Sequence, residues 1–255
     1  EFPDNPTEAK NFNRLARRFR SDLNALGEKK HRPFLLTMAV NASPHLSKWL
    51  DTEVLLETMD FINVMTYDFF GSWSNQAGHH SALFESSKAK GISTQKAMTY
   101  WHQGKGIPKE KLLLGLPLYS RGFAAAKPYD RVNRNATRPF QALTYAKLHP
   151  LIKGDWKYTW DDETQNPWLT SPQTDYVHSY DNEKSLATKT KWAIEQDYRG
   201  VFFWEIKQDR LKDGSNPLLE ASHKALTGLK LPPDWLDEVA VDYDTNHPWK
   251  DARLE

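Results

Sequence analysis

The segment LLLGLPLY at residues 112–119 is an almost unbroken apolar run, without the alternation of polar and apolar side chains that marks a half-exposed strand. Three further runs share this character: FLLTMAV at 34–40, FINVMTY at 61–67 and GVFFWEI at 200–206. Strands that are buried on both faces read this way, and they occur in parallel sheets covered by helices. The four runs therefore predict a parallel β-sheet.

Helical patterns lie between these runs. The clearest covers residues 12–26, where apolar side chains recur every 3.6 residues, and it is predicted to end at Gly27. Asn5, Pro6 and Glu8 supply a cap, a first-turn proline and a capping-box acid at its start. The alternation of helices and strands predicts an α/β fold, either a βα barrel or a doubly wound sheet. Further helices are expected at about 46–59, 92–104, 184–198 and 217–227.

Residues 122–180 interrupt the alternation. Short mixed runs and the turn signals Asn166-Pro167 and Ser171-Pro172 predict a small inserted α+β subdomain. The alternative is a long irregular loop at an active site, although structureless loops of that length are uncommon. We therefore expect four parts: barrel elements at 1–121, the inserted subdomain at 122–180, a helix–strand–helix unit at 181–227, and a C-terminal extension or linker at 228–255.

Composition excludes several classes of function. With 34 basic and 33 acidic residues and a net charge of +1, the chain has no basic stripe for nucleic acid. No apolar run reaches the ~20 residues of a membrane span, so we expect no membrane partner. Cysteine is absent, which excludes disulfides and thiolate metal sites. The remaining candidate for a metal site, His79-His80, lies in a glycine-containing loop without other ligands, so we expect loop hydrogen bonds there and no metal or other cofactor.

Aromatic and polar residues gather at the ends of the predicted strands, where a barrel places its reactive groups. The ends read Met65-Thr66-Tyr67-Asp68, followed by Phe69, then Tyr119-Ser120-Arg121 and Trp204-Glu205, and the chain opens with Glu1-Phe2-Pro3 ahead of a helix. Carboxylates, tyrosine hydroxyls and stacking rings together suit a sugar. The aromatic content of 13% fits this reading, although part of it belongs to the core.

Four of these segments resemble successive motifs of the family 18 chitinases: MTYD at 65–68, LGLPLYSRGF at 114–123, Tyr180-Asp181 with Ser185, and GVFFWE at 200–205. The region with Trp156, Tyr158, Trp160 and Asp161 is similar to the insertion domain of one chitinase subgroup. The resemblance implies a (β/α)8 TIM barrel, of which this chain holds the part from the end of strand 4 to helix 8, with the insertion after strand 7. Glu1-Phe2-Pro3 is similar to the end of the family's Asp-x-x-Asp-x-Asp-x-Glu motif, so we expect a chain shortened at its N-terminus that begins at the catalytic glutamate.

The resemblance also implies an endochitinase-type glycosidase that acts on chitin or chito-oligosaccharides, retains the anomeric configuration and uses the substrate's own acetamido group. Glu1 would be the acid and base, while Tyr67 would hold the acetamido oxygen and Asp68 would bond the distorted sugar. An extracellular, monomeric protein is expected. The remaining residues that we expect to bind substrate are Met65, Phe69, Tyr119, Arg121, Trp160 and Trp204.

Other interpretations stay open at this point. Tyr67 and Asp68 would also fit a strand-end hydroxyl and a cap, Trp204 would fit barrel packing, and Arg121 would fit a pairing with a carboxylate. Glu205 is predicted to be structural, because strand alternation turns it away from Trp204. Two other functions compete with the chitinase: a carbohydrate-binding relative without catalysis, and a related hydrolase of glycoprotein glycans or peptidoglycan.

Overall fold

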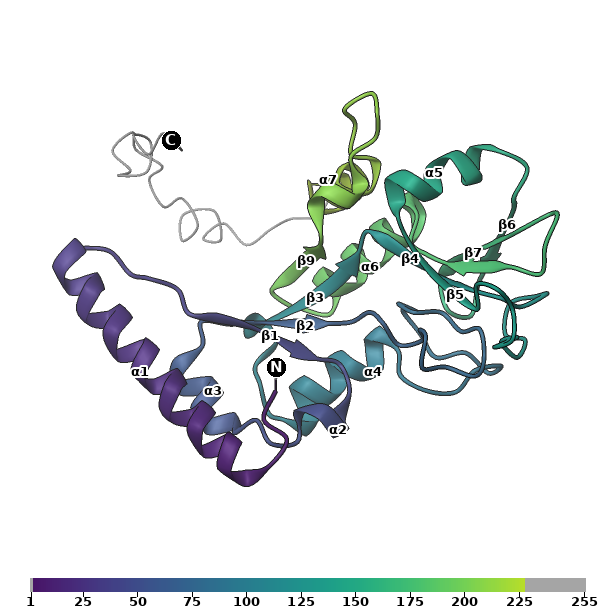
Figure 1. Ribbon diagram of the computed structural model, residues 1–255. Coiled ribbons are helices and arrows are strands. Elements are labelled where there is room, and N and C mark those ends of the chain that lie inside the picture. The colour runs from purple at the N-terminus through teal and green to yellow at the C-terminus, as the bar shows by residue number, and fades with distance from the viewer. Residues whose placement is uncertain (1, 228–255) are drawn as a thin grey trace, which may run out of the picture.

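The computed structural model describes residues 2–227 (Figure 1). Glu1, the predicted acid, and residues 228–255, the predicted extension or linker, lie outside the described residues. The helices are α1 (Pro6–Lys30), α2 (Pro44–Ser47), α3 (Thr52–Thr58), α4 (Thr94–Thr99), α5 (Tyr145–Lys153), α6 (Glu183–Glu195) and α7 (Pro217–Thr227), with a π-helical turn η1 (Tyr100–Gly104) and 3-10 turns η2 (Lys109–Lys111) and η3 (Ile206–Asp209). The strands are β1 (Thr37–Asn41), β2 (Phe61–Met65), β3 (Leu112–Pro117), β4 (Tyr119–Phe123), β5 (Phe140–Thr144), β6 (Lys157–Asp161), β7 (Asn166–Thr170), β8 (Val177–Ser179) and β9 (Gly200–Trp204).

The four predicted runs form one parallel sheet in the order β1-β2-β3-β9. One row of side chains crosses it in register, from Val40 through Val64 and Leu114 to Val201. Val40, Val64 and Leu114 are fully buried, in one core with residues of α3, α4 and α6. The predicted parallel sheet is therefore confirmed.

Helix α1 begins where the sequence predicts, because the Asn5 side chain accepts hydrogen bonds from two backbone N–H groups of the first turn. The predicted end at Gly27 is wrong, because the helix continues to Lys30. A Cβ on Gly27 would lie 2.9 Å from the carbonyl oxygen of Arg32, so the glycine makes room for the reversing chain and does not stop the helix. Although α1 is long, none of the helices within residues 2–227 combines the length and the apolar character needed to cross a membrane.

The segment predicted as a single helix at about 46–59 is two short helices, α2 and α3. The break lies at Asp51, whose carboxylate accepts from the backbone N–H groups of Glu53 and Val54 and so caps α3. Aspartate favours such caps because its side chain competes for backbone donors. The helical periodicity of the sequence continues across this break, so the pattern alone predicts one helix instead of two.

Only Leu118 separates β3 from β4, and it joins the two sheets of the molecule. Its N–H donates to the carbonyl of Trp204 (2.8 Å), and its carbonyl accepts from the N–H of Tyr145 (2.9 Å). Strand β4 then enters a second, antiparallel sheet with the order β5-β4-β8-β7-β6 (Figure 1). Strand β4 runs from Tyr119 to Phe123 and so crosses the predicted boundary between residues 121 and 122. The division into domains stays a prediction.

A buried ion pair joins α6 to the segment that precedes it, and a hydrogen bond connects this pair to the loop between β2 and α4. Lys189 Nζ lies 2.6 Å from Asp181 Oδ1, and both side chains are almost completely buried. The hydroxyls of Ser81 and Ser185 donate to the same carboxylate at 2.7 and 2.6 Å. Burial lowers the pKa of Lys189, and Asp181 opposes that shift. A buried charge is tolerated only when it is paired and hydrogen-bonded in this way.

We expect the substitution Asp181→Ala to destabilise the fold by about 3–5 kcal/mol, because it leaves the Lys189 ammonium buried without its partner. Urea unfolding at pH 7 measures the change. The control is Asp22→Ala, which removes the exposed pair with Arg18 on α1 and should cost less than about 1 kcal/mol. Equal small losses for both variants would contradict the role given to the buried pair.

Candidate active site

The end of β2 turns sharply into the cleft at Asp68. This residue has a φ of 60°, in the left-handed region that aspartate tolerates better than most residues. Two bonds hold the turn: Thr66 Oγ1 donates to the Gly115 carbonyl (2.7 Å), and the Phe69 N–H donates to the His80 carbonyl (3.0 Å). The turn directs the carboxylate toward β4 of the antiparallel sheet.

Asp68 is held by two residues of β4. Arg121 makes a bidentate contact, with Nε and one terminal nitrogen 2.8 and 2.7 Å from the carboxylate oxygens, and the Tyr119 hydroxyl donates at 2.8 Å. Burial by itself would raise the pKa of Asp68, but His80 and Arg121 outweigh it and hold that pKa well below its ordinary value. Asp68 is therefore a carboxylate anion at neutral pH, and its side-chain partners are Arg121 and Tyr119.

Tyr67 precedes Asp68 and lies in a ring of close neighbours. Its ring packs edge-on to Tyr119, with centroids 6.2 Å apart, and beside Phe202 at 6.3 Å. A Cβ on Gly115 would lie 2.8 Å from the Tyr67 ring, so only glycine fits there. The Tyr67 hydroxyl is buried and has no hydrogen-bond partner among residues 2–227. Burial and the nearby Asp68 raise the pKa of this hydroxyl, so it stays protonated and can donate.

A cavity of about 540 Å³ opens in front of these groups at the junction of the two sheets. Trp204 lines this cavity and is 55% exposed, so its ring is accessible from the cavity side. Glu205 caps η3 through the backbone N–H of Lys207, which agrees with a structural role. The cavity is lined by Phe2, Ala39, Met65, Tyr67, Asp68, Tyr119, Arg121, Ala142, Leu143, Thr144, Trp204 and Gln208.

Five other predicted site residues lie in or near this cavity. Met65, Tyr119, Arg121 and Trp204 line it, whereas Phe69 does not and instead packs against the main core.

Trp160 lies on β6, at the far edge of the antiparallel sheet, and is absent from the cavity lining. The ammonium of Lys184 lies over one face of its ring, 3.8 Å from the centroid. Binding of substrate by Trp160 therefore stays a prediction without support from this cavity.

Two further residues, one in the cavity lining and one beside it, were not among the predicted site residues. Gln208 lines the cavity from η3, and its side-chain oxygen is buried without a hydrogen-bond partner in the described part of the chain. Trp73 is 58% exposed and lies beside Arg121, whose guanidinium carbon is 5.9 Å from its ring. Trp73 follows the MTYD segment by five residues, a signal that could have found it, but nothing local distinguishes Gln208 from a surface glutamine.

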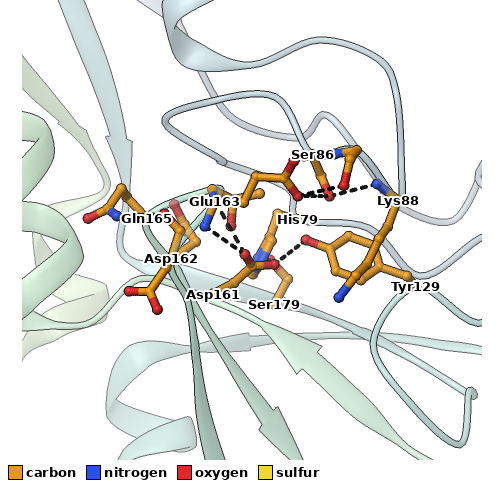
Figure 2. A network of polar contacts seen from close by, with 12 residues as sticks. His79, Ser86, Lys88, Tyr129, Asp161, Asp162, Glu163, Gln165 and Ser179 are labelled. Atoms are coloured by element: carbon orange, nitrogen blue, oxygen red, sulfur yellow. Dashed lines mark hydrogen bonds and ion pairs between the residues drawn. The ribbon is translucent and has the colours of Figure 1, made fainter.

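The two adjacent histidines, His79 and His80, are buried in the loop between β2 and α4. His79 contacts Ser179 Oγ through Nδ1 (3.1 Å) and lies 3.6 Å from Asp161 through Nε2. Figure 2 shows that Asp161 also accepts a hydrogen bond from the hydroxyl of Tyr129. Burial lowers the pKa of His79 to about 4. Within residues 2–227 no cluster of three metal-ligating side chains occurs. His79 makes its hydrogen bond through the ring, whereas His80 bonds through its backbone N–H.

Comparison with known proteins assigns the fold and site to a family. Residues 1–209 match the glycosyl hydrolases family 18. The chain belongs to this family. Chitinase 1 of Aphanocladium album is 30% identical over 257 residues, which cover 96% of this chain and 58% of that protein. The probable endochitinase of Caenorhabditis elegans is 29% identical over 264 residues, covering 91% of this chain and 41% of that protein. The chain thus spans about half the length of these family 18 relatives.

Solved structures bear out the family 18 fold. An immunomodulatory active chitinase from Trichuris suis matches with a TM-score of 0.78 at 26% identity, covering 89% of this chain and 67% of that one. The Ostrinia furnacalis Group IV chitinase, solved in complex with allosamidin, matches with a TM-score of 0.78 at 25% identity, covering 89% and 66%. The parallel sheet is therefore part of a TIM barrel, not of a doubly wound fold, and the antiparallel sheet is its insertion.

We expect the stabilising effect of Asp68 to depend on pH. Its pKa is depressed in the folded protein, so its contribution is present above the ordinary aspartate range and is lost as the pH falls through and below about 4. The difference in unfolding free energy between the wild type and Asp68→Asn, measured with urea, should shrink between pH 6 and pH 3. The exposed Asp162→Asn is the control and should show almost no difference at either pH. A constant difference for Asp68→Asn would contradict the assignment.

Proposed function

We propose that this chain carries a chitinase cleft and hydrolyses β-1,4-linked N-acetylglucosamine polymers with retention at the anomeric carbon. The observation that carries the proposal is the buried hydroxyl of Tyr67, which faces the cavity beside Asp68 without a partner in the described residues. An unsatisfied buried hydroxyl costs free energy, and the amide oxygen of an N-acetyl sugar would satisfy it. Membership of family 18 and the chitinase names of the relatives support the same substrate.

The proposed mechanism uses one carboxylic acid and the substrate's own amide. Glu1 gives its proton to the glycosidic oxygen as the bond from that oxygen to the anomeric carbon breaks. The acetamido oxygen forms the new bond to the anomeric carbon from the opposite face, and an oxazolinium ion results. Water then attacks the anomeric carbon, with Glu1 as the base, and the two inversions give retention. Family 18 is an exception to the rule of two carboxylates in glycoside hydrolysis.

The other cleft residues position and stabilise this ion. The protonated hydroxyl of Tyr67 donates to the acetamido oxygen and holds it in the attacking geometry. The anionic Asp68 lies beside it and stabilises the positive charge of the oxazolinium ion. Trp204 offers an exposed ring as the floor under the sugar, and Met65 lines the wall near the acetamido methyl group. Arg121 acts through Asp68, since its bidentate contact is made to that carboxylate.

We expect Glu1→Gln to abolish the release of soluble products from chitin while binding of chitotetraose persists, because glutamine cannot protonate the leaving oxygen. Product release by the wild-type chain and calorimetric binding of chitotetraose are the two measurements. Undiminished turnover by Glu1→Gln would exclude its role as the acid. Binding by the wild type without any release would identify a lectin-like protein and overturn the proposed hydrolysis.

We expect Trp204→Ala and Trp73→Ala each to weaken chitotetraose binding about two- to tenfold, since loss of an aromatic stacking contact costs about 0.5–1.5 kcal/mol. Trp160→Ala is the matched control, because its ring is covered by Lys184 outside the cavity. Titration calorimetry measures all three variants. A larger loss for Trp160 than for Trp204 would move the binding surface to the insertion sheet.

The setting of the protein is part of the proposal. We infer a monomer that acts outside the cell on chitin or chito-oligosaccharides, as the family resemblance implies. Sedimentation of the full chain and the location of the expressed protein would test these two points. A stable dimer, or retention inside the cell, would contradict them.

A further inference from the structure

His80 lies directly behind the cleft, although it does not line the cavity. Its side chain is fully buried, and neither ring nitrogen has a hydrogen-bond partner among the described residues. A buried imidazole without partners costs free energy unless its surroundings use it. The position of the ring therefore requires a reason beyond packing.

The His80 backbone connects both sheets. Its carbonyl accepts the N–H of Phe69, the residue after Asp68, at 3.0 Å. Its own N–H donates to Ser179 Oγ on β8 of the antiparallel sheet at 3.1 Å. Phe69 follows the left-handed turn at Asp68, so this chain of bonds ties the turn to β8.

The His80 ring contacts the same side chains that hold the carboxylate. Nδ1 lies 3.8 Å from Asp68 Oδ1, the oxygen that already accepts from Tyr119 and Arg121. The ring also packs against the ring of Tyr119, with centroids 5.2 Å apart and planes at 45°. The charged groups that act on His80 from the elements packed around it are Asp68, Asp181 and Lys189.

We propose that His80 is a positioning residue for Asp68: its ring supports Tyr119 and presents Nδ1 to the carboxylate, while Ser179 of the insertion sheet holds His80 in place. The consequence for sugar binding rests on the proposed function. The ring is neutral near pH 7, because burial lowers its pKa more than Asp68 raises it. A proton on Nδ1 then directs an N–H dipole from a third residue toward Asp68, beside the two N–H groups of Arg121 and the hydroxyl of Tyr119.

The adjacent histidine has a different environment, which separates the two roles. Ser179 Oγ accepts from the His80 N–H and contacts His79 Nδ1 on its other side. Figure 2 shows His79 directed toward Asp161 and Tyr129, in the network away from the cleft. One serine of β8 therefore aligns both histidines, and only His80 faces Asp68.

The test compares His80→Leu, which removes the donor, with His80→Asn, whose amide nitrogen can replace Nδ1. Carbon-13 NMR of the Asp68 carboxyl group in the full chain follows its titration and needs no ligand. We expect the titration midpoint to move to higher pH in His80→Leu and to stay near the wild-type position in His80→Asn. Chitotetraose binding should weaken about three- to tenfold in His80→Leu, the cost of one lost buried interaction, and recover in His80→Asn.

Two further variants keep the test decisive. Val54→Ala, on the buried face of α3, should lower the melting temperature and leave both readouts unchanged, which excludes a general loss of stability as their cause. If His80→Leu does not fold, His80→Gln places its amide at the position of Nε2 and should behave as the donor-free variant. An unchanged Asp68 titration in the donor-free variant, or equal behaviour of the asparagine and donor-free variants, would overturn the proposal. Failure of the wild type to bind chitotetraose would count against the proposed function alone.

Discussion

The carboxylate of Asp68 joins the two sheets of this molecule across the cleft. It comes from the end of β2 in the parallel sheet, and its hydrogen bonds come from Arg121 and Tyr119 on β4. A half-buried anion needs several well-placed donors, and these donors belong to the other sheet. Satisfying this charge therefore fixes how the barrel edge and the insertion meet. Tyr67, the neighbouring residue in the cavity lining, keeps a hydroxyl without a hydrogen-bond partner among residues 2–227.

The backbone around Leu118 makes this arrangement possible. A single residue separates β3 from β4, and both of its backbone groups are paired, one with Trp204 and the other with Tyr145. The chain can therefore leave a parallel sheet and enter an antiparallel one without an unsatisfied buried amide. This connection places Tyr119 and Arg121 within reach of the end of β2. The same junction directs Trp204 toward the cavity.

Behind the cleft, a loop without regular structure is held by buried polar groups. It carries His79, His80 and Ser81, and each has a specific partner or neighbour in another element. The Ser179 hydroxyl contacts the ring of His79 and accepts from the backbone N–H of His80. The carboxylate of Asp181 accepts hydrogen bonds from Ser81 and Lys189. The backbone N–H of His80 and the hydroxyl of Ser81 make these bonds, whereas the His80 ring has no hydrogen-bond partner among residues 2–227. The loop in turn supports the turn at Asp68.

The positions of the parallel strands, and Tyr67 and Asp68 as the central residues of the site, were predicted from local sequence. Strands buried on both faces have an uninterrupted apolar pattern, and the carboxyl ends of parallel strands meet at one edge, so Tyr67, Asp68, Arg121 and Trp204 could be grouped in advance. The cap at Asn5 was equally local. The end of α1 was not, because Gly27 serves the packing of the returning chain and not the end of the helix.

Tertiary structure alone decided how these groups are used. The sequence offered Arg121 as a ligand of substrate or as an ion-pair partner, and only the approach of β4 to β2 shows that its charge is directed to Asp68. Trp160 was predicted to bind substrate, a role that stays a prediction. Its strand β6 lies at the far edge of the insertion sheet, and Lys184 lies over its ring. His80 read as a loop histidine until Ser179, ninety-nine residues away, placed it beside Asp68. Residue types and strand order are properties of the local chain, whereas these contacts exist only where segments distant in sequence are packed together.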